Sequence, residues 1–175
     1  QKDFDPKLSR LDQPYYGMDL TTQRYEGFLK TGRMFEKGIN RSMGWINEVA
    51  HHRMEGFFGN NDYKGLNTHY YSNLIFQTNI NNTNHQLKTG ASFLLDDYRE
   101  QYSNIDLKRR EIVPGAFAEY QYSFLTTLTV LAGMRVDYHN LYGVFATPRL
   151  HIRYSPKELT TFRVSAGRGY RVASI

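Results

Sequence analysis

LTVLAGMRVDY, residues 128–138, alternates between apolar and polar side chains, with Leu131 as the one exception. Successive side chains of a β-strand point to opposite faces of the sheet, so this alternation predicts a strand with an apolar wall and a charged wall. The apolar wall carries Leu128, Val130, Ala132, Met134, Val136 and Tyr138. The charged wall carries Thr129, Gly133, Arg135 and Asp137. Such a strand fits a sheet with a different environment on each side.

The stretches before and after this strand follow the same rule. Residues 116–124, 148–154 and 162–167 place large apolar side chains on one parity and polar or charged side chains on the other. Their lengths are close to the ~9–11 residues that a tilted strand needs to cross the apolar core of a bilayer. The sequence therefore predicts an all-β fold, an antiparallel meander of about eight strands. The predicted strands cover residues 22–35, 41–52, 67–80, 85–96, 111–124, 128–138, 146–154 and 161–170.

The composition excludes several classes of protein. No run approaches the ~18–20 apolar residues of a transmembrane helix, which excludes a helical membrane protein. The net charge of +5 is spread along the chain, so no nucleic-acid partner is expected. The chain has no cysteine, which excludes disulfides and thiolate zinc sites. The 14 tyrosines, with abundant glycine and threonine, favour sheet over helix.

The connections between the predicted strands alternate in length. Short polar turns at residues 36–40, 81–84, 125–127 and 155–158 alternate with longer segments, of which 52–66 and 97–110 are the longest. Outer-membrane barrels have short periplasmic turns and longer external loops. We therefore expect the two long segments to be mobile external loops that meet a substrate first. Their candidate substrate-contact residues are His52, Tyr63, Asp97 and Tyr102.

Four consecutive motifs resemble a known family. They are GAFAEY at 115–120, AGMRVDYHN at 132–140, TPRL at 147–150 and RVSAGRGYR at 163–171. In order and spacing they resemble the mid-barrel of TonB-dependent outer-membrane receptors, particularly those of Bacteroidetes-type bacteria. The resemblance covers about residues 22–175 and is strongest after residue 113.

The resemblance implies both a fold and a function. Residues 1–175 would form about eight strands of a barrel of about 22 strands, with an external loop at 1–20, strands over 22–171 and the plug domain absent. The protein would lie in the outer membrane of a Gram-negative cell and take up a siderophore, cobalamin or a glycan. Its partners would be outer-membrane lipid, the rest of the barrel, the plug and, through the plug, the TonB energy-coupling complex. No enzyme activity, cofactor or metal is implied.

The charged wall supplies the candidate residues for the lumen of such a barrel and for contact with its plug. They are Glu119, Arg135, Asp137, Arg149, His151, Arg153 and Arg163. Like charges placed directly opposite each other repel, so Glu119 and Asp137 are the expected counter-charges. The arginines are expected to face the plug or an anionic solute.

Counting residues through each turn predicts the register of the strands. The turn near residue 126 places Phe117 opposite Arg135. The turn near residue 142 places Arg135 opposite Arg149, and the turn at Pro156 places His151 opposite Arg163.

Other interpretations remain open from the sequence. One is a self-contained small outer-membrane barrel, structural or a hydrolase that uses Asp137, His139 and Ser103. Another is a soluble β-sandwich that binds carbohydrate through its tyrosines. A metal site at His51, His52, Met54 and His69, or a calcium site at Asp96, Asp97, Glu100 and Asp106, is disfavoured because neither spacing matches a known ligand pattern.

Overall fold

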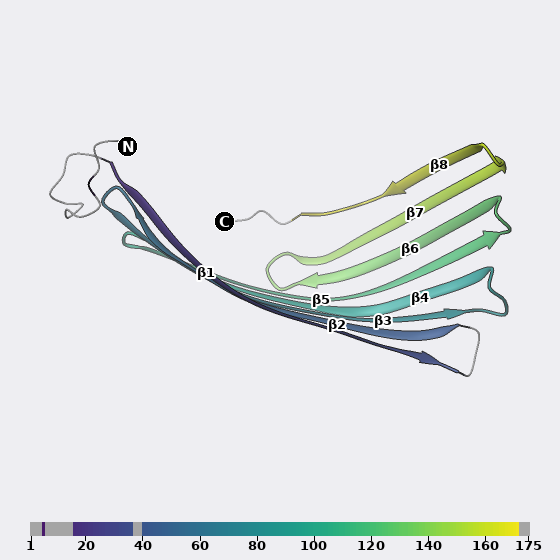
Figure 1. The fold of residues 1–175 in the computed structure, drawn as a ribbon, viewed down its shortest axis with the longest axis horizontal. Helices are drawn as coiled ribbons and strands as arrows, with labels where there is room; N and C mark the ends of the chain where they lie inside the picture. The colour runs from purple at the N-terminus through teal and green to yellow at the C-terminus, as the bar shows by residue number, and fades with distance from the viewer. Residues whose placement is uncertain (1–4, 6–15, 37–39, 172–175) are drawn as a thin grey trace. The chain divides into compact units, whose positions relative to one another are not determined.

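The computed structural model describes residues 5, 16–36 and 40–171, and its strands form one eight-stranded sheet in chain order (Figure 1). The strands are β1 Met18–Phe35, β2 Arg41–Phe58, β3 Asn61–Asn79, β4 His85–Tyr102, β5 Ile105–Phe124, β6 Leu128–His139, β7 Gly143–Lys157 and β8 Thr160–Gly167. The predicted all-β antiparallel meander is confirmed. Among the described residues there is no helix that could cross a membrane.

The chain divides into two compact units. Unit 1 comprises Gln1–Phe28, Glu48–Tyr70 and Leu95–Glu111, and unit 2 comprises Leu29–Asn47, Tyr71–Leu94 and Ile112–Ile175. Unit 1 contains the turns that join β2 to β3 and β4 to β5. Unit 2 contains the turns that join β3 to β4, β5 to β6, β6 to β7 and β7 to β8.

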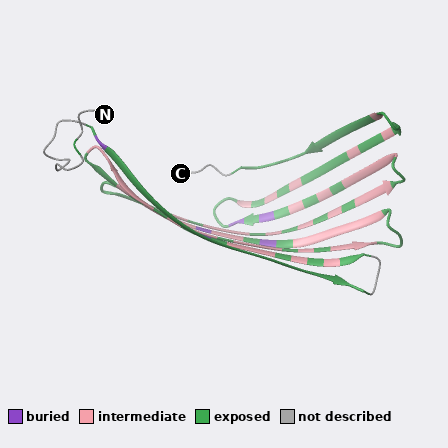
Figure 2. Ribbon diagram, in the orientation of Figure 1, coloured by how far each residue is buried: buried purple, intermediate pink, exposed green. Residues whose placement is uncertain are grey.

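The exposure pattern of β6 is the reverse of that of a soluble sheet. Met134, Val136 and Tyr138 are 48%, 44% and 53% exposed, whereas Asp137 and His139 are each 2% exposed. Figure 2 shows a similar alternation as bands along β5, β6 and β7. The apolar wall is therefore the exposed one, and polar side chains are the shielded ones.

The register between β5 and β6 is the predicted one. Phe117 lies opposite Arg135, and Phe124 lies opposite Leu128 at the turn. Leu125 has a φ of 49°, which lets a three-residue turn join the two strands without shifting their pairing.

The registers predicted for the next two strand pairs are wrong by two residues. Arg135 lies opposite Thr147 rather than Arg149, because the chain turns at 140–142 and Gly143, with a φ of 82°, pairs with His139. His151 lies opposite Ser165 rather than Arg163, because the chain turns at residues 158–159, after Pro156, where Lys157 pairs with Thr160. An irregularity between Tyr154 and Lys157 then changes the pairing by one residue. Shifts of two residues keep every side chain on its predicted face.

The prediction of two long external loops at 52–66 and 97–110 is wrong. β2 continues to Phe58 and β3 begins at Asn61, while β4 continues to Tyr102 and β5 begins at Ile105. Each connection is a two-residue turn that starts with a left-handed residue, Gly59 (φ 59°) or Ser103 (φ 53°). Polar residues, charged residues and glycine are frequent in these extensions, so the sequence lacks the sustained apolar alternation that marks a half-buried strand.

The outer limits of the sheet differ slightly from prediction. β1 begins at Met18, inside the loop predicted at 1–20, of which residues 1–4 and 6–15 lie outside the described residues. β8 ends at Gly167, three residues before the predicted end. The strand order makes β1 and β8 the two edges of this sheet.

Engineered disulfides will test the register of β6 and β7, because the chain has no cysteine of its own. Thr129 and Arg153 are directly paired, and paired residues of an antiparallel sheet lie within reach of a disulfide. The variant T129C/R153C should therefore oxidise to a single intramolecular disulfide, detected by mobility on a non-reducing gel. The control T129C/S155C should not, and efficient crosslinking in that control alone would contradict the observed register.

Candidate functional site

The seven residues predicted for the lumen all lie on one face of β5–β8. Direct pairing places Glu119, Gly133 and Arg149 in one row across β5, β6 and β7. Residues two apart along a strand share a face, so this row assigns the other residues of these strands to one face or the other. The remaining members of this face are Arg135, Asp137, His151, Arg153 and Arg163. We call it the polar face of unit 2, and the opposite one the apolar face. Whether the polar face contacts a plug or a solute stays a prediction.

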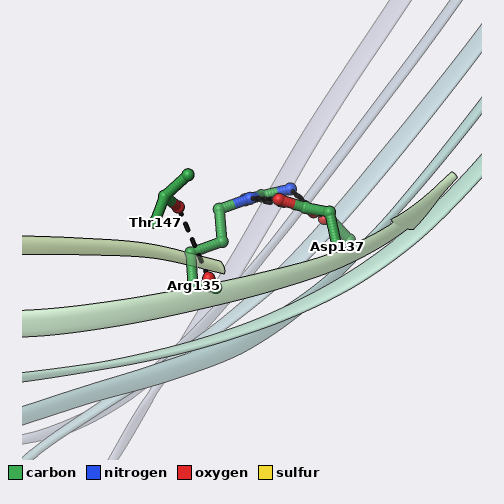
Figure 3. Close-up of polar contacts among 4 residues, drawn as sticks. Arg135, Asp137 and Thr147 are labelled. Atoms are coloured by element: carbon green, nitrogen blue, oxygen red, sulfur yellow. Dashed lines mark hydrogen bonds and ion pairs between the residues drawn. The ribbon is translucent and has the colours of Figure 1, made fainter. Parts of the chain in front are cut away.

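A charge-assisted network on β6 is the most buried part of the polar face. Arg135 Nε donates to Asp137 Oδ1 and Oδ2 at 3.0 and 2.7 Å, and Arg135 Nη2 donates to Asp137 Oδ1 at 2.7 Å. Arg135 Nη2 also donates to Ser92 Oγ on β4 at 2.7 Å. Figure 3 shows Arg135 reaching along β6 to Asp137, while Thr147 Oγ1 donates to the Arg135 carbonyl oxygen at 3.4 Å. Such bidentate contacts are among the stronger side-chain interactions in proteins.

A second ion pair connects two strands that are not neighbours. Glu119 on β5 pairs with Arg149 on β7, and the residue between them on β6 is Gly133. A Cβ atom at Gly133 would lie 3.0 Å from Glu119 Cγ and 3.2 Å from Arg149 Cγ. Glycine therefore leaves the space in which the carboxylate and the guanidinium meet. The predicted counter-charges are thus in place: Asp137 pairs with Arg135, and Glu119 pairs with Arg149.

Near the turns at the two ends of β7, the polar face contains two further arrangements. His151 Nδ1 and Ser165 Oγ are hydrogen-bonded at 2.9 Å, and Arg153 lies directly opposite Arg163. His139 Nδ1 accepts a hydrogen bond from the Leu141 amide at 3.1 Å, so this histidine stabilises the turn between β6 and β7. The third residue of the hydrolase alternative, Ser103, belongs to unit 1 and forms a turn there.

Unit 1 has its own polar cluster, on β3, β4 and β5. His69 Nδ1 lies 2.6 Å from Asp96 Oδ1, and Arg109 pairs with Glu111. Burial raises the pKa of Tyr98, and the nearby carboxylates of Asp96 and Glu111 raise it further, against the opposing effects of Arg109 and of a hydrogen bond with Asn67. This cluster joins three strands through polar contacts where apolar packing is scarce.

The four candidates for substrate contact lie in strands of unit 1 and do not form one cluster. The Nε2 atom of His52 on β2 is buried and has no hydrogen-bond partner among the described residues. Tyr63 on β3 packs edge-on against Phe58 with ring centroids 6.1 Å apart, and burial, followed by Glu100, raises its pKa. The hydroxyl of Tyr102 on β4 accepts from Asn61 Nδ2 at 3.2 Å.

Asp97 points to the other side of β4, because its neighbours Asp96 and Tyr98 share the face of the unit 1 cluster. It accepts a hydrogen bond from Arg99 Nη2 at 3.0 Å. No set of three His, Cys, Asp or Glu side chains in the described part of the chain is arranged to hold a metal ion.

Sequence reasoning missed the residues that surround the named candidates. They are Asn67, Ser92, Tyr98, Arg109 and Glu111. Tyr98 and Arg109 lie in a segment predicted as loop. In a loop, the spacing of two residues does not show whether their side chains share a face. Had 97–110 been recognised as a hairpin, its alternation would have placed Tyr98 with Asp96.

Comparison with known proteins identifies the architecture. Residues 3–175 match the family described as TonB dependent receptor-like, beta-barrel. The chain belongs to this family. The resemblance read from the four motifs is thereby confirmed, and TonB-dependent receptor barrels are outer-membrane receptors that serve transport.

Two further comparisons add less. None of the curated proteins matches this sequence. The solved structure of CdiB from Acinetobacter baumannii is similar over 90% of this chain, at 9% identity and a TM-score of 0.37. The chain spans 45% of the length of that CdiB chain.

Replacing Gly133 with valine should separate Glu119 from Arg149, because the added side chain would occupy the space in which they meet. The expected loss in the free energy of unfolding is about 1–3 kcal/mol, as for other overpacked sites. Thr129→Val, on the same face of the same strand, is the control and should change stability by less. Denaturant unfolding in lipid vesicles measures both, and an equal effect would show that the space above Gly133 is not needed.

Proposed function

We propose that this chain forms part of the barrel of an outer-membrane receptor that imports a large, scarce nutrient with energy delivered through TonB. The observation that supports this most strongly is the reversed exposure of β6, with apolar side chains outside and charged ones shielded. In water such a surface would be costly, because contiguous exposed apolar patches favour association. In a bilayer the same surface is solvated by lipid.

The apolar face supplies a surface of the required kind. Its large exposed side chains include Met134, Val136, Tyr138, Leu150, Tyr154, Phe162 and Val164. Direct pairing places these side chains on one face of three adjacent strands. An outward apolar band with aromatic residues towards its ends is the pattern of outer-membrane barrels.

The polar face fits the inside of a barrel that transports a solute. Arg153 and Arg163 lie directly opposite each other, and within residues 16–36 and 40–171 neither forms an ion pair. Two adjacent cations attract an anion. We therefore assign this pair to contact with an anionic group of the plug or of the passing solute.

The two edges of the sheet support a larger barrel. An edge strand leaves backbone N–H and C=O groups without partners, which a bilayer does not tolerate. β1 and β8 are such edges in this strand order. Further strands of the same receptor would complete the ladder on both sides. A soluble β-sandwich needs a second sheet to cover its apolar face, and the described strands form one sheet.

The lipid-facing role of the apolar face can be tested on β7. Ile152→Arg should lower the free energy of unfolding in lipid vesicles by about 2–4 kcal/mol if the side chain lies near the bilayer midplane. His151→Arg, the next residue on the opposite face, should cost much less, because it loses only a hydrogen bond with Ser165. Equal losses, or a larger loss at His151, would contradict the assignment of the two faces.

Transport itself is tested with the full receptor in its own cell. Strains with the receptor deleted, with TonB deleted, and with neither deleted are grown in complex medium, and mass spectrometry follows which solutes disappear. At least one large solute should be depleted only when the receptor and TonB are both present. Depletion that needs the receptor and persists without TonB would refute the energy coupling.

A further inference from the structure

The hairpin of β7 and β8 carries a row of hydrogen-bonding side chains on its polar face. They form three successive cross-strand pairs, which are His151 with Ser165, Arg153 with Arg163, and Ser155 with Thr161. The two outer pairs are hydrogen-bonded internally, at 2.9 Å and 3.0 Å. The middle pair places two exposed arginines directly opposite each other. We call Arg153 and Arg163 the arginine pair.

The other two arginines of the polar face differ from this pair, because each has a carboxylate of its own. Arg135 is held by Asp137, and Arg149 is held by Glu119. These carboxylate side chains are only 3% and 13% exposed, so the contacts are largely shielded. Within the described residues the arginine pair forms no ion pair. The sheet therefore neutralises the arginines that join its strands and leaves the arginine pair open to a ligand.

The surroundings of the arginine pair contain no counter-charge within reach. The one carboxylate side chain in residues 143–171 is that of Glu158, in the turn between β7 and β8. Lys157, the residue before it, is already ~13 Å from Arg153 along the strand. On β6 the residue opposite Arg153 is Thr129. Like charges directly opposite each other destabilise a sheet, so the arginine pair costs stability while no anion lies between its side chains.

We infer that the imported solute carries a carboxylate or phosphate group and that the arginine pair binds this group. The inference rests on the import function proposed above and names a chemical class for the solute. A guanidinium presents its N–H donors in a planar fork that matches a carboxylate or a phosphate, and two forks can hold one such group from both sides. Binding also relieves the repulsion between the two arginines.

The stability of the receptor without its solute separates this inference from pairing with the plug or with another strand. The full receptor is unfolded with urea in lipid vesicles, in a chloride buffer without phosphate. The variant R153Q/R163Q removes the repulsion and should be at least as stable as the unchanged receptor. A carboxylate of the plug or of a neighbouring strand would make the arginines stabilising, so the variant would then unfold at lower urea concentration. That result would overturn the inference.

Inorganic phosphate serves as the probe for the site itself. A ligand that binds only the folded protein raises its stability, so millimolar phosphate at constant ionic strength should raise the urea midpoint of the unchanged receptor. The control K157Q/R168Q removes the same charge from the same part of the chain and should keep this response, whereas R153Q/R163Q should lose it. No response in the unchanged receptor, or an equal response in all three proteins, would overturn the inference. The single variants R153Q and R163Q replace the double variant if its gel mobility no longer shifts on boiling, the sign of a folded barrel.

The depletion experiment proposed above identifies the class of the solute. Cells with R153Q/R163Q should deplete the receptor-dependent solute about tenfold more slowly than cells with K157Q/R168Q, and that solute should migrate as an anion at neutral pH. A solute without an acidic group would overturn the inference and leave the transport function intact. Absence of TonB-dependent depletion, with a normal response to phosphate, would instead refute the transport function and leave an anion site without a transported solute.

Discussion

Hydrogen bonding between neighbouring strands is the interaction on which this structure depends, because the described residues have almost no apolar core. Ala50 is the only hydrophobic residue among them that is buried. A soluble domain gains most of its stability from apolar area removed from water. Here the backbone ladder holds the strands together, and a bilayer would supply the apolar contacts. In a bilayer an unpaired backbone group is costly, which favours strands that pair along their whole length.

Polar side chains supply several of the side-chain interactions between strands. Arg135 joins Asp137 and Ser92, Glu119 reaches Arg149, and His69 reaches Asp96. The Glu119–Arg149 and His69–Asp96 contacts join different strands. The Arg135–Asp137 pair lies within β6 and holds Arg135 where it reaches Ser92 on β4. Because these groups are partly shielded, their charges are screened less than those of surface ion pairs. On the polar face, charged residues provide the contacts between strands that leucine and valine provide in the core of a soluble sheet.

The sequence predicted which side of the sheet each side chain lies on more accurately than it predicted the register between neighbouring strands. Alternation around Arg135 and Asp137 is a local signal, so the parity of every lumen candidate could be read from it. The pairing of β7 depends on the backbone conformation of Gly143, on the position of the turn after Lys157 and on the irregularity after Tyr154. Alternation reports none of these. The extensions of β2 to β5 were predicted to be loops because they are rich in polar residues, charged residues and glycine. Tyr98 and Arg109 were missed for the same reason.

The empty space above Gly133 gives the sheet a way to distinguish registers that share the same faces. A slip of β6 by two residues preserves every apolar and every polar face, so burial alone would hardly oppose it. Such a slip would place Leu131 or Arg135 between Glu119 and Arg149, and either side chain would keep the carboxylate from the guanidinium. Only one alignment of the three strands puts a residue without a side chain at the crossing. Gly133 therefore stabilises the native alignment relative to slips of two residues, because the native alignment alone leaves room for the Glu119–Arg149 pair.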